Sequence, residues 1–366
     1  PGVPASPEIL LGAFGTKTGP IGAQVVSAEV AIRAWVADVN SRGGLAGHPV
    51  RVIVYDDGGD PGRALAAVRR MVEEDKVLAL YGSFGAATTH AVAPYLEEKG
   101  VPMVGGVPAP VADTSPMIFN PETGGTKGTA RSYLATIKTL SDKTRVGFFY
   151  CREADTCTEA AEEVRAYAPR LGLSVVYMAA VSLAQPDYTA EVLAARNAGA
   201  EVLSLSLDLA SYTRVAAAAH RQGWQPVISG ASQVHQDVGG AADELEGLLG
   251  AATVVPYTTS ARMRPYLEAV ARYVPGGALG EYGAANWVGG KLWERLAATF
   301  GSGPVTRGQV LDALYGLRDE TLGDLVPPLT FPKGAHIDVN LCTYPIQLRA
   351  GRWTSPRGDQ PVCAPD

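Results

Sequence analysis

Three short motifs resemble catalytic sites, and each lacks part of what its chemistry requires. Ser83 lies in Gly82-Ser83-Phe84-Gly85, but a nucleophile elbow needs G-x-S-x-G and position 81 is tyrosine. Gly15-Thr16-Lys17-Thr18 resembles the end of a phosphate-binding loop, yet the upstream glycine spacing of that loop is missing. Asp56-Asp57 resembles a metal or acid–base pair, although such a pair more often ends a strand in solvent, where one aspartate caps the next turn. We therefore expect a non-enzymatic protein without a cofactor or a bound metal.

A run of small residues after a predicted strand indicates a place where a ligand meets the backbone. Residues 77–81 read as a buried strand, and Phe84, Gly85, Ala86 and Thr88 lead from it into a helix. Small side chains let a ligand approach the N–H groups of the first helical turn, which carry positive partial charge. Thr88 adds a hydroxyl donor, so the segment suits a carboxylate. The alternative is a well-packed helix entrance without a ligand.

Strands and helices alternate along the chain in a way that places such turns at one edge of a sheet. The expected strands are 10–14, 50–55, 77–81, 101–104, 145–150, 174–179, 202–207 and 226–229. Helical patterns separate them, and the chain continues with helices at 261–273, 282–300 and 306–317 and a β-rich segment at 329–353. This alternation implies right-handed crossovers and parallel sheets. In such sheets, ligands bind outside the carboxyl ends of the strands.

Composition and charge argue against several classes of partner. The 366 residues are 46% hydrophobic and 19% charged, which is typical of a soluble α/β protein. The formal charge of −6 is spread without a basic block, so nucleic acid and anionic membranes are poor partners. We see no apolar run long enough to span a membrane. The amino terminus reads as a mature start from which any signal peptide has been removed, and a cytosolic protein is the alternative.

Four cysteines form two locally spaced pairs, Cys151 with Cys157 and Cys342 with Cys363. Of the three possible connectivities, the local one closes the shortest loops. Loop closure would contribute about 2 kcal/mol for the short loop and about 3 kcal/mol for the longer one. Two disulfides would require an oxidising compartment. A zinc site and four free thiols are the alternatives, although the zinc spacing C-x-x-C is missing.

The stretch from Gly15 to Arg63 also resembles a known family. It contains, in order, Gly19-Pro20, a helix, Asn40, Gly43-Gly44, Gly47, a strand, Asp56-Asp57 and Asp60-Pro61. This order is similar to that of the branched-chain amino-acid-binding (Leu/Ile/Val-binding-protein-like) family, the type I extracytoplasmic solute-binding proteins of ABC importers. The resemblance continues through residues 76–104 and 187–203 and on to nearly the end of the chain.

The resemblance implies a type I periplasmic binding protein fold, an α/β fold of two doubly wound parallel-sheet lobes joined by a three-segment hinge. Lobe 1 would comprise residues 1–121 and 256–330, and lobe 2 residues 122–255 and 331–366. The lobes would close around a solute. The family further implies an extracytoplasmic protein, periplasmic or lipid-anchored. Such a protein delivers a small amino acid or a small carboxylate, aromatic ones included, to an ABC permease. We expect a monomer with no nucleic-acid partner.

The resemblance also suggests ligand residues in both lobes. In lobe 1 it adds Gly106, Val107 and Pro108, which follow the strand at 101–104, and we include Thr18 from the first Gly-rich turn. In lobe 2, Asp155 and Thr156 occupy the position of an aromatic lid residue. The other candidates follow later strands or form apolar walls, and they are Asp208, Leu209, Ser232, Tyr257, Phe84 and Trp287. Tyr257 and Trp287 are more typical of core positions.

Asp208 is the one acid well placed to meet the ammonium group of an amino acid. Its alternative role is to cap the helix that follows it. Amino-acid binders of this family usually have an acid after the next strand, where this chain has residues 229–233 without one. The departure leaves room for a carboxylate that carries no ammonium group.

Two other functions remain open from the sequence. The same fold could sense a small molecule for a receptor or regulator, although we find no DNA-binding or membrane-spanning segment. An α/β hydrolytic or transfer enzyme would have to use Ser83 or Asp208, and mutation of either would abolish turnover while leaving ligand affinity intact.

Overall fold

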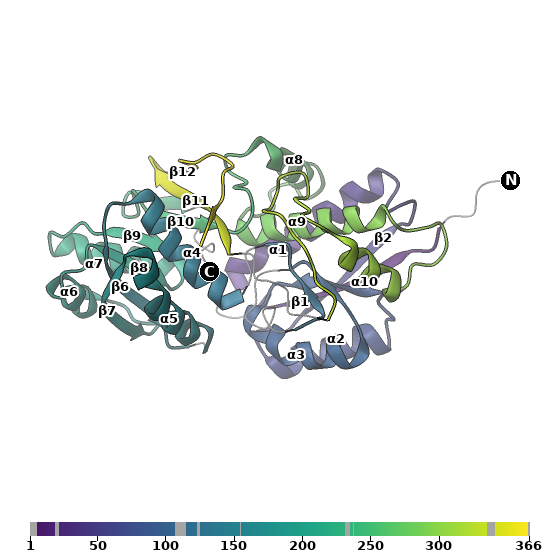
Figure 1. The fold of residues 1–366 in the computed structure, drawn as a ribbon, viewed down its shortest axis with the longest axis horizontal. Coiled ribbons are helices and arrows are strands. Elements are labelled where there is room, and N and C mark those ends of the chain that lie inside the picture. The colour runs from purple at the N-terminus through teal and green to yellow at the C-terminus, as the bar shows by residue number, and fades with distance from the viewer. Residues whose placement is uncertain are drawn as a thin grey trace. The chain divides into compact units, whose positions relative to one another are not determined.

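The chain folds into two compact α/β units (Figure 1). The computed structural model describes residues 6–18, 22–106, 115–122, 125–153, 155–230, 235–236, 238–334 and 341–364. Unit 1 comprises Pro1–Gly125 and Ala261–Asn340, and unit 2 comprises Thr126–Ser260 and Leu341–Asp366. The chain therefore passes between the units three times, and the predicted fold class of two α/β lobes is confirmed. The sequence analysis predicted boundaries for two lobes that close around a solute, and those boundaries stay a prediction.

Unit 1 contains a parallel five-stranded sheet in the order β2-β1-β3-β4-β5. Its strands are β1 (Ile9–Gly15), β2 (Val50–Asp56), β3 (Ala79–Ser83), β4 (Met103–Val104) and β5 (Ile118–Phe119). Every residue of β3 is buried, because helices cover both faces of the sheet.

The helices of unit 1 form two groups. They are α1 (Gly22–Ser41), α2 (Pro61–Glu73), α3 (Ala86–Lys99), α8 (Arg264–Tyr273), α9 (Glu281–Ala297) and α10 (Arg307–Gly316). α2 packs against α3, and α1 packs against α8 and α9. Leu80 of β3 belongs to the core under α2 and α3, whereas the ring of its neighbour Tyr81 lies 5.1 Å from that of Trp35 on α1. Since adjacent strand residues point to opposite faces, the two helix groups cover opposite faces.

Unit 2 contains a larger, mixed sheet in the order β12-β11-β10-β9-β8-β6-β7, with β13 paired to β11. Its strands are β6 (Arg145–Cys151), β7 (Ser174–Val181), β8 (Val202–Ser206), β9 (Val227–Gly230), β10 (Leu249–Ala252), β11 (Cys342–Arg349), β12 (Arg352–Thr354) and β13 (Val362–Cys363). Strands β6 to β10 are parallel to one another, and β11 is antiparallel to its three partners.

The helices of unit 2 are α4 (Gly125–Leu140), α5 (Asp155–Tyr167), α6 (Thr189–Asn197) and α7 (Leu209–Arg221). Short 3-10 segments are η2 (Ala168–Leu171) and η4 (Gly239–Ala241), and in unit 1 η5 (Ala261–Met263) precedes α8. α4 and α5 bury one apolar face against Val146 and Phe148 of β6 and Val202 of β8. No helix that the structure describes combines the length and apolar character needed to cross a bilayer.

Local signals in the sequence explain several helix boundaries. Asp60 caps α2 by accepting a hydrogen bond from the backbone amide of Arg63, with Pro61 in the first turn, as predicted. α3 ends at Gly100, which has the left-handed φ of 60° that glycine adopts without strain. Thr306 and Gln309 form a capping box at the start of α10.

Candidate functional site

The carboxyl ends of β1, β2 and β3 meet at one edge of the sheet in unit 1. Gly15 pairs with Asp56, and Phe14 pairs with Ser83. Because the strands are parallel, the residues that follow them, Thr16, Asp57 and Phe84, lie at the same edge. The sequence predicted ligand contacts at this place.

Asp57 connects the segments that follow the three strands. The side chain is fully buried, and Oδ1 accepts hydrogen bonds from the Thr16 hydroxyl at 2.9 Å and the Gly59 amide at 2.8 Å. Oδ2 accepts from the Thr88 hydroxyl at 2.6 Å. The expectation of a solvent-exposed aspartate pair is therefore wrong for Asp57. The reason is that the neighbouring loops fold over the end of β2 and offer it three donors.

Asp56 is exposed and organises the turn that contains Thr18. Its carboxylate accepts from the Thr18 hydroxyl at 2.7 Å and from the backbone amides of Lys17 at 2.8 Å and Gly58 at 3.0 Å. Burial raises the pKa of this carboxyl, but these hydrogen bonds outweigh burial and lower the pKa to about 2. Thr18 itself is exposed at this edge.

Ser83 stabilises its own loop. The side chain is buried, its oxygen accepts from the Gly85 amide at 3.0 Å, and it accepts from the Thr89 hydroxyl at 2.8 Å. All of these partners belong to the loop and the first turn of α3, so the serine has the contacts of a turn residue. The interpretation of Ser83 as a nucleophile gains no support from these contacts.

The start of α3 leaves its first backbone amides without a side-chain cap. Gly85 is the N-cap residue and its extended backbone supplies no side-chain hydrogen bond. Ala86 begins the helix, and the first N–H groups of a helix have no acceptor within it. Thr88 is buried, and its hydroxyl donates to Asp57. An anion at this edge would therefore meet backbone amides.

Phe84 and Gly106 are placed by packing inside unit 1. The Phe84 ring is 1% exposed and lies against Gly15, where an added Cβ would come within 2.4 Å of a ring carbon. Gly106 follows β4, and its backbone packs directly on Ser83 and Gly82. Val107 and Pro108 lie outside the described residues, as do Gly19-Pro20 of the family motif.

In unit 2, a disulfide joins the end of β6 to the first turn of α5. Cys151 and Cys157 are bonded, and so are Cys342 and Cys363, which are paired residues of β11 and β13. Both predicted disulfides are confirmed. Thr156 is half-buried in the first turn of α5; Asp155 begins that helix, and its side chain lies outside the description.

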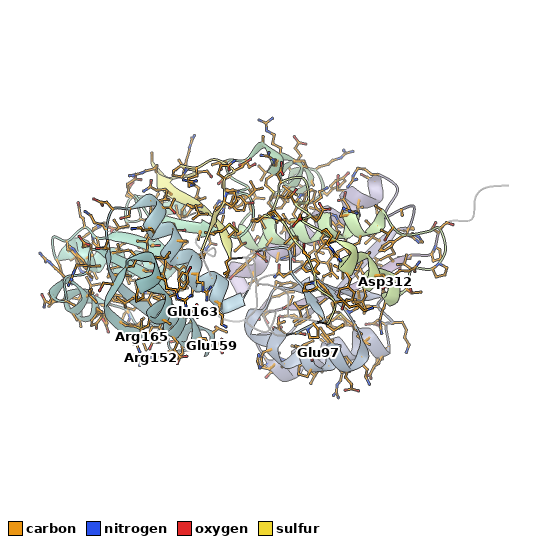
Figure 2. All side chains as sticks on the ribbon, viewed as in Figure 1. Glu97, Arg152, Glu159, Glu163, Arg165 and Asp312 are labelled. Atoms are coloured by element: carbon orange, nitrogen blue, oxygen red, sulfur yellow. A yellow bond between two sulfur atoms is a disulfide. The ribbon has the colours of Figure 1, made fainter. Side chains whose placement is uncertain are left out.

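Charged side chains in and before α5 contact neighbouring groups of unit 2. Figure 2 labels Arg152 together with Glu159 and Glu163 of α5. Arg152 donates to the carbonyl of Ala180 at 2.9 Å, and Glu163 pairs with Arg131 at 2.7 Å.

Asp208 caps the helix that follows β8. Its Oδ1 accepts from the backbone amide of Ser211 at 3.1 Å, and Leu209 begins α7 and is half-buried. The capping alternative given by the sequence is thus present, and within the described part of the chain Oδ2 accepts no hydrogen bond. Ser232 lies outside the described residues.

The two aromatic candidates, Tyr257 and Trp287, lie in the interiors of their units. The Tyr257 ring is 5% exposed in unit 2, with its centroid 4.5 Å from that of His235. Trp287 is 1% exposed on α9 of unit 1. Both positions have the burial that is typical of core residues.

A cavity in the described part of unit 2 lies away from the strand ends described above. Among the described residues, no three His, Cys, Asp or Glu side chains come together as metal ligands. A cavity of about 530 Å³ in unit 2 is lined by Val227 and Leu249, the first residues of β9 and β10, with Leu140 at the end of α4. It therefore lies at the amino ends of the strands, the edge opposite to Asp208.

Comparison with known proteins places the chain in a family. A family model described as periplasmic binding protein matches residues 8–352. The chain belongs to that family. Curated relatives described as Leu/Ile/Val-binding proteins support the branched-chain amino-acid-binding group that the motif from Gly15 to Arg63 predicted.

Two curated relatives and two solved structures are similar to this binding protein. An "Amino acid binding protein" of Pseudomonas aeruginosa is 24% identical over 54% of this chain and 53% of the relative. A "Leu/Ile/Val-binding protein" of Escherichia coli K12 is 26% identical over 26% of each. The chain thus matches about half of the first relative's length and about a quarter of the second's.

The structures share the fold over their full length. A fatty acid ABC transporter substrate-binding protein from Thermomonospora curvata has a TM-score of 0.77 and 20% identity, with 100% of this chain and 96% of that chain covered. A solute-binding protein of R. palustris in complex with benzoate has a TM-score of 0.78 and 14% identity, with 98% of both chains covered. At this identity the likeness shows the fold.

The main feature that sequence reasoning missed is the connection made by Asp57. Thr16 and Thr88 both follow strands and both carry a hydroxyl, which was a usable signal. Their pairing with one buried carboxylate depends on how three loops converge, and residue spacing alone does not give this.

Proposed function

We propose that this binding protein captures a small carboxylate-bearing solute outside the cytoplasm and delivers it to an ABC transporter without chemical change. Family membership supports a solute-binding role, and the ligands for which similar proteins are named include amino acids, fatty acids and benzoate. The two disulfides agree with an oxidising, extracytoplasmic compartment.

One observation carries the proposed position of the carboxylate. The start of α3 lies at the carboxyl edge of the sheet in unit 1, and Gly85 provides no side-chain cap. Backbone amides of a first helical turn bind anions through direct hydrogen bonds and the positive end of the helix dipole. In this proposal Gly85, Ala86 and Gly106 bring backbone to the solute, and Thr18 lines the edge.

The other residues of the predicted site either support the loop from inside or stay candidates for direct contact with the solute. Thr88 and Phe84 support the first-lobe loop from inside, as their burial suggests. Thr156 and Leu209 in unit 2, with Asp155, Ser232, Val107 and Pro108, stay candidates for direct contact. Asp208 meets an ammonium group only if the solute is an amino acid.

A ligand panel tests the function. Thermal unfolding of the purified full chain is measured with L-leucine, benzoate and hexanoate, one member of each ligand class. A solute at a hundred times its Kd stabilises the folded protein by about 2.7 kcal/mol, so a binder raises the melting temperature, and the rise grows with the logarithm of its concentration above Kd. If none of the three shifts the melting temperature and the protein turns over ester or amide substrates, the proposed binding role is wrong and the protein is an enzyme.

A further inference from the structure

We propose that Asp57 is the positioning residue of the solute site: its buried carboxylate holds the first turn of α3 in register with the loop after β1. The inference rests on the proposed function for its link to solute, whereas the connection itself is visible in the hydrogen bonds. Asp57 does not have to touch the solute to act in this way.

The connection spans strands that are not neighbours. In the sheet order β2-β1-β3, the end of β1 lies between Asp57 and the loop after β3. Strands lie about 4.8 Å apart, so the ends of β2 and β3 are about 10 Å apart. The carboxylate nevertheless bonds to Thr16 at 2.9 Å and to Thr88 at 2.6 Å, so it joins the loop after β1 to the first turn of α3.

The cluster packs directly on the residue that precedes α3. A Cβ added to Gly85 would lie 2.6 Å from Thr88 Oγ1, 3.2 Å from Thr16 Oγ1 and 3.3 Å from Asp57 Oδ2. The place of Gly85, and hence of the backbone amides that follow it, is therefore set by these three oxygens. A residue with a side chain at 85 would push the helix start away from the cluster.

The carboxylate is held by neutral donors. Its hydrogen-bond partners are two hydroxyls and the Gly59 amide, and the nearby Lys17 pairs instead with Glu29 at 2.8 Å. A buried charge of this kind depends on all its hydrogen bonds. Loss of the acceptor would leave the Thr16 and Thr88 hydroxyls to find other partners, and Thr88 has one at 3.0 Å in the Gly85 carbonyl.

Two variants and a control distinguish the loss of the Asp57 hydrogen bonds from a general loss of stability. Asp57→Asn keeps the shape and Oδ1 but replaces the acceptor that faces Thr88, and Thr88→Val removes the hydroxyl from the other side. The matched control is Asp60→Ala, three residues further on, which removes the cap of α2 and touches neither loop. All variants are made in the full chain.

Amide hydrogen exchange read by mass spectrometry is the first measurement. In Asp57→Asn and in Thr88→Val we expect exchange about tenfold faster at residues 84–88, the scale of one charge-assisted hydrogen bond. Strands β1 and β3 should keep their protection, and Asp60→Ala should change only the start of α2. Unchanged exchange at 84–88 in both variants, or equal loss across β1 and β3, overturns the inference.

Binding of the panel solutes is the second measurement. The solute that stabilises the wild type, L-leucine, benzoate or hexanoate, should bind about tenfold more weakly to both variants and with unchanged affinity to Asp60→Ala. Unchanged affinity in the variants refutes the positioning role even if exchange is faster. A wild type that binds none of the three, with the local exchange change intact, refutes the proposed solutes and supports the connection, so the two failures are distinguishable.

Discussion

A methyl group at Gly106 would force apart two loops at the proposed site. Gly106 has a φ of 90°, and an added Cβ would lie 2.6 Å from the amide nitrogen and 2.7 Å from the carbonyl oxygen of Ser83. A Cβ at Gly82 would in turn lie 2.4 Å from the Gly106 nitrogen. All of these are backbone atoms, which cannot rotate away, so Gly106→Ala requires the ends of β3 and β4 to separate.

The expected loss of unfolding free energy in Gly106→Ala follows from a comparison with Gly100. Gly100 has a φ of 60°, and nothing lies within 4 Å of its added Cβ, so Gly100→Ala reports the cost of left-handed backbone alone. That cost is about 1–2 kcal/mol. Gly106→Ala adds overpacking of about 1–3 kcal/mol, and the sum is about 2–5 kcal/mol of unfolding free energy.

Urea unfolding followed by tryptophan fluorescence measures both variants. Trp293 is a suitable reporter because its indole N–H donates to the carbonyl of Val104, two residues before Gly106, at 3.2 Å. We expect Gly106→Ala to lose about 1–3 kcal/mol more than Gly100→Ala, and to lose solute affinity that Gly100→Ala keeps. Equal losses in the two variants would refute the reasoning, since they would show that the loops separate without cost.

Three further predictions concern other residues of the two edges. Asp208→Ala should lower the unfolding free energy by about 1 kcal/mol while Asp208→Asn, which still caps, leaves it nearly unchanged in the same assay; weaker leucine binding by Asp208→Asn would reveal an ammonium contact. Replacing Cys151 and Cys157 with serine should cost about 2 kcal/mol in calorimetry, a difference that a reductant abolishes. The pKa of Asp56 is lowered to about 2 in the folded protein and is about 3.9 in the unfolded chain. The ionised carboxylate therefore stabilises the fold above about pH 3.9, and this stabilisation is lost as the pH falls toward 2. Asp56→Asn should remove this acid step from a profile of melting temperature against pH.

Much of the architecture could be predicted because its signals are local. The cap at Asp60, the glycine end at Gly100 and the two disulfides each depend on residues close in sequence. The alternation of apolar runs with helical periods likewise predicted the parallel strands β1 to β10 and the edge at which they end, although not the antiparallel strands that complete the sheet of unit 2. Burial and hydrogen bonding at that edge could not be derived in the same way.

Asp57 and Phe84 show where sequence reasoning stops. An aspartate after a strand is normally solvated, and an aromatic ring in a glycine-rich loop is a plausible ligand wall. Here Asp57 is fully buried, and the Phe84 ring lies against Gly15 inside the unit. Both outcomes depend on side chains that arrive from other loops, which no spacing rule specifies.

The order of amino acids by itself determined the fold class, favoured the two cysteine pairs and predicted the sheet edge at which we propose a ligand, because periodicity, caps and turn residues act over a few positions. Only the tertiary structure decided which groups at that edge are free and which are already bonded. It joined Thr16, Asp57 and Thr88, which are far apart in the sequence, within hydrogen-bond distance. The physical reason is that a hydrogen bond needs its partners within about 3 Å, and that proximity is created by the packing of three loops rather than by any one of them.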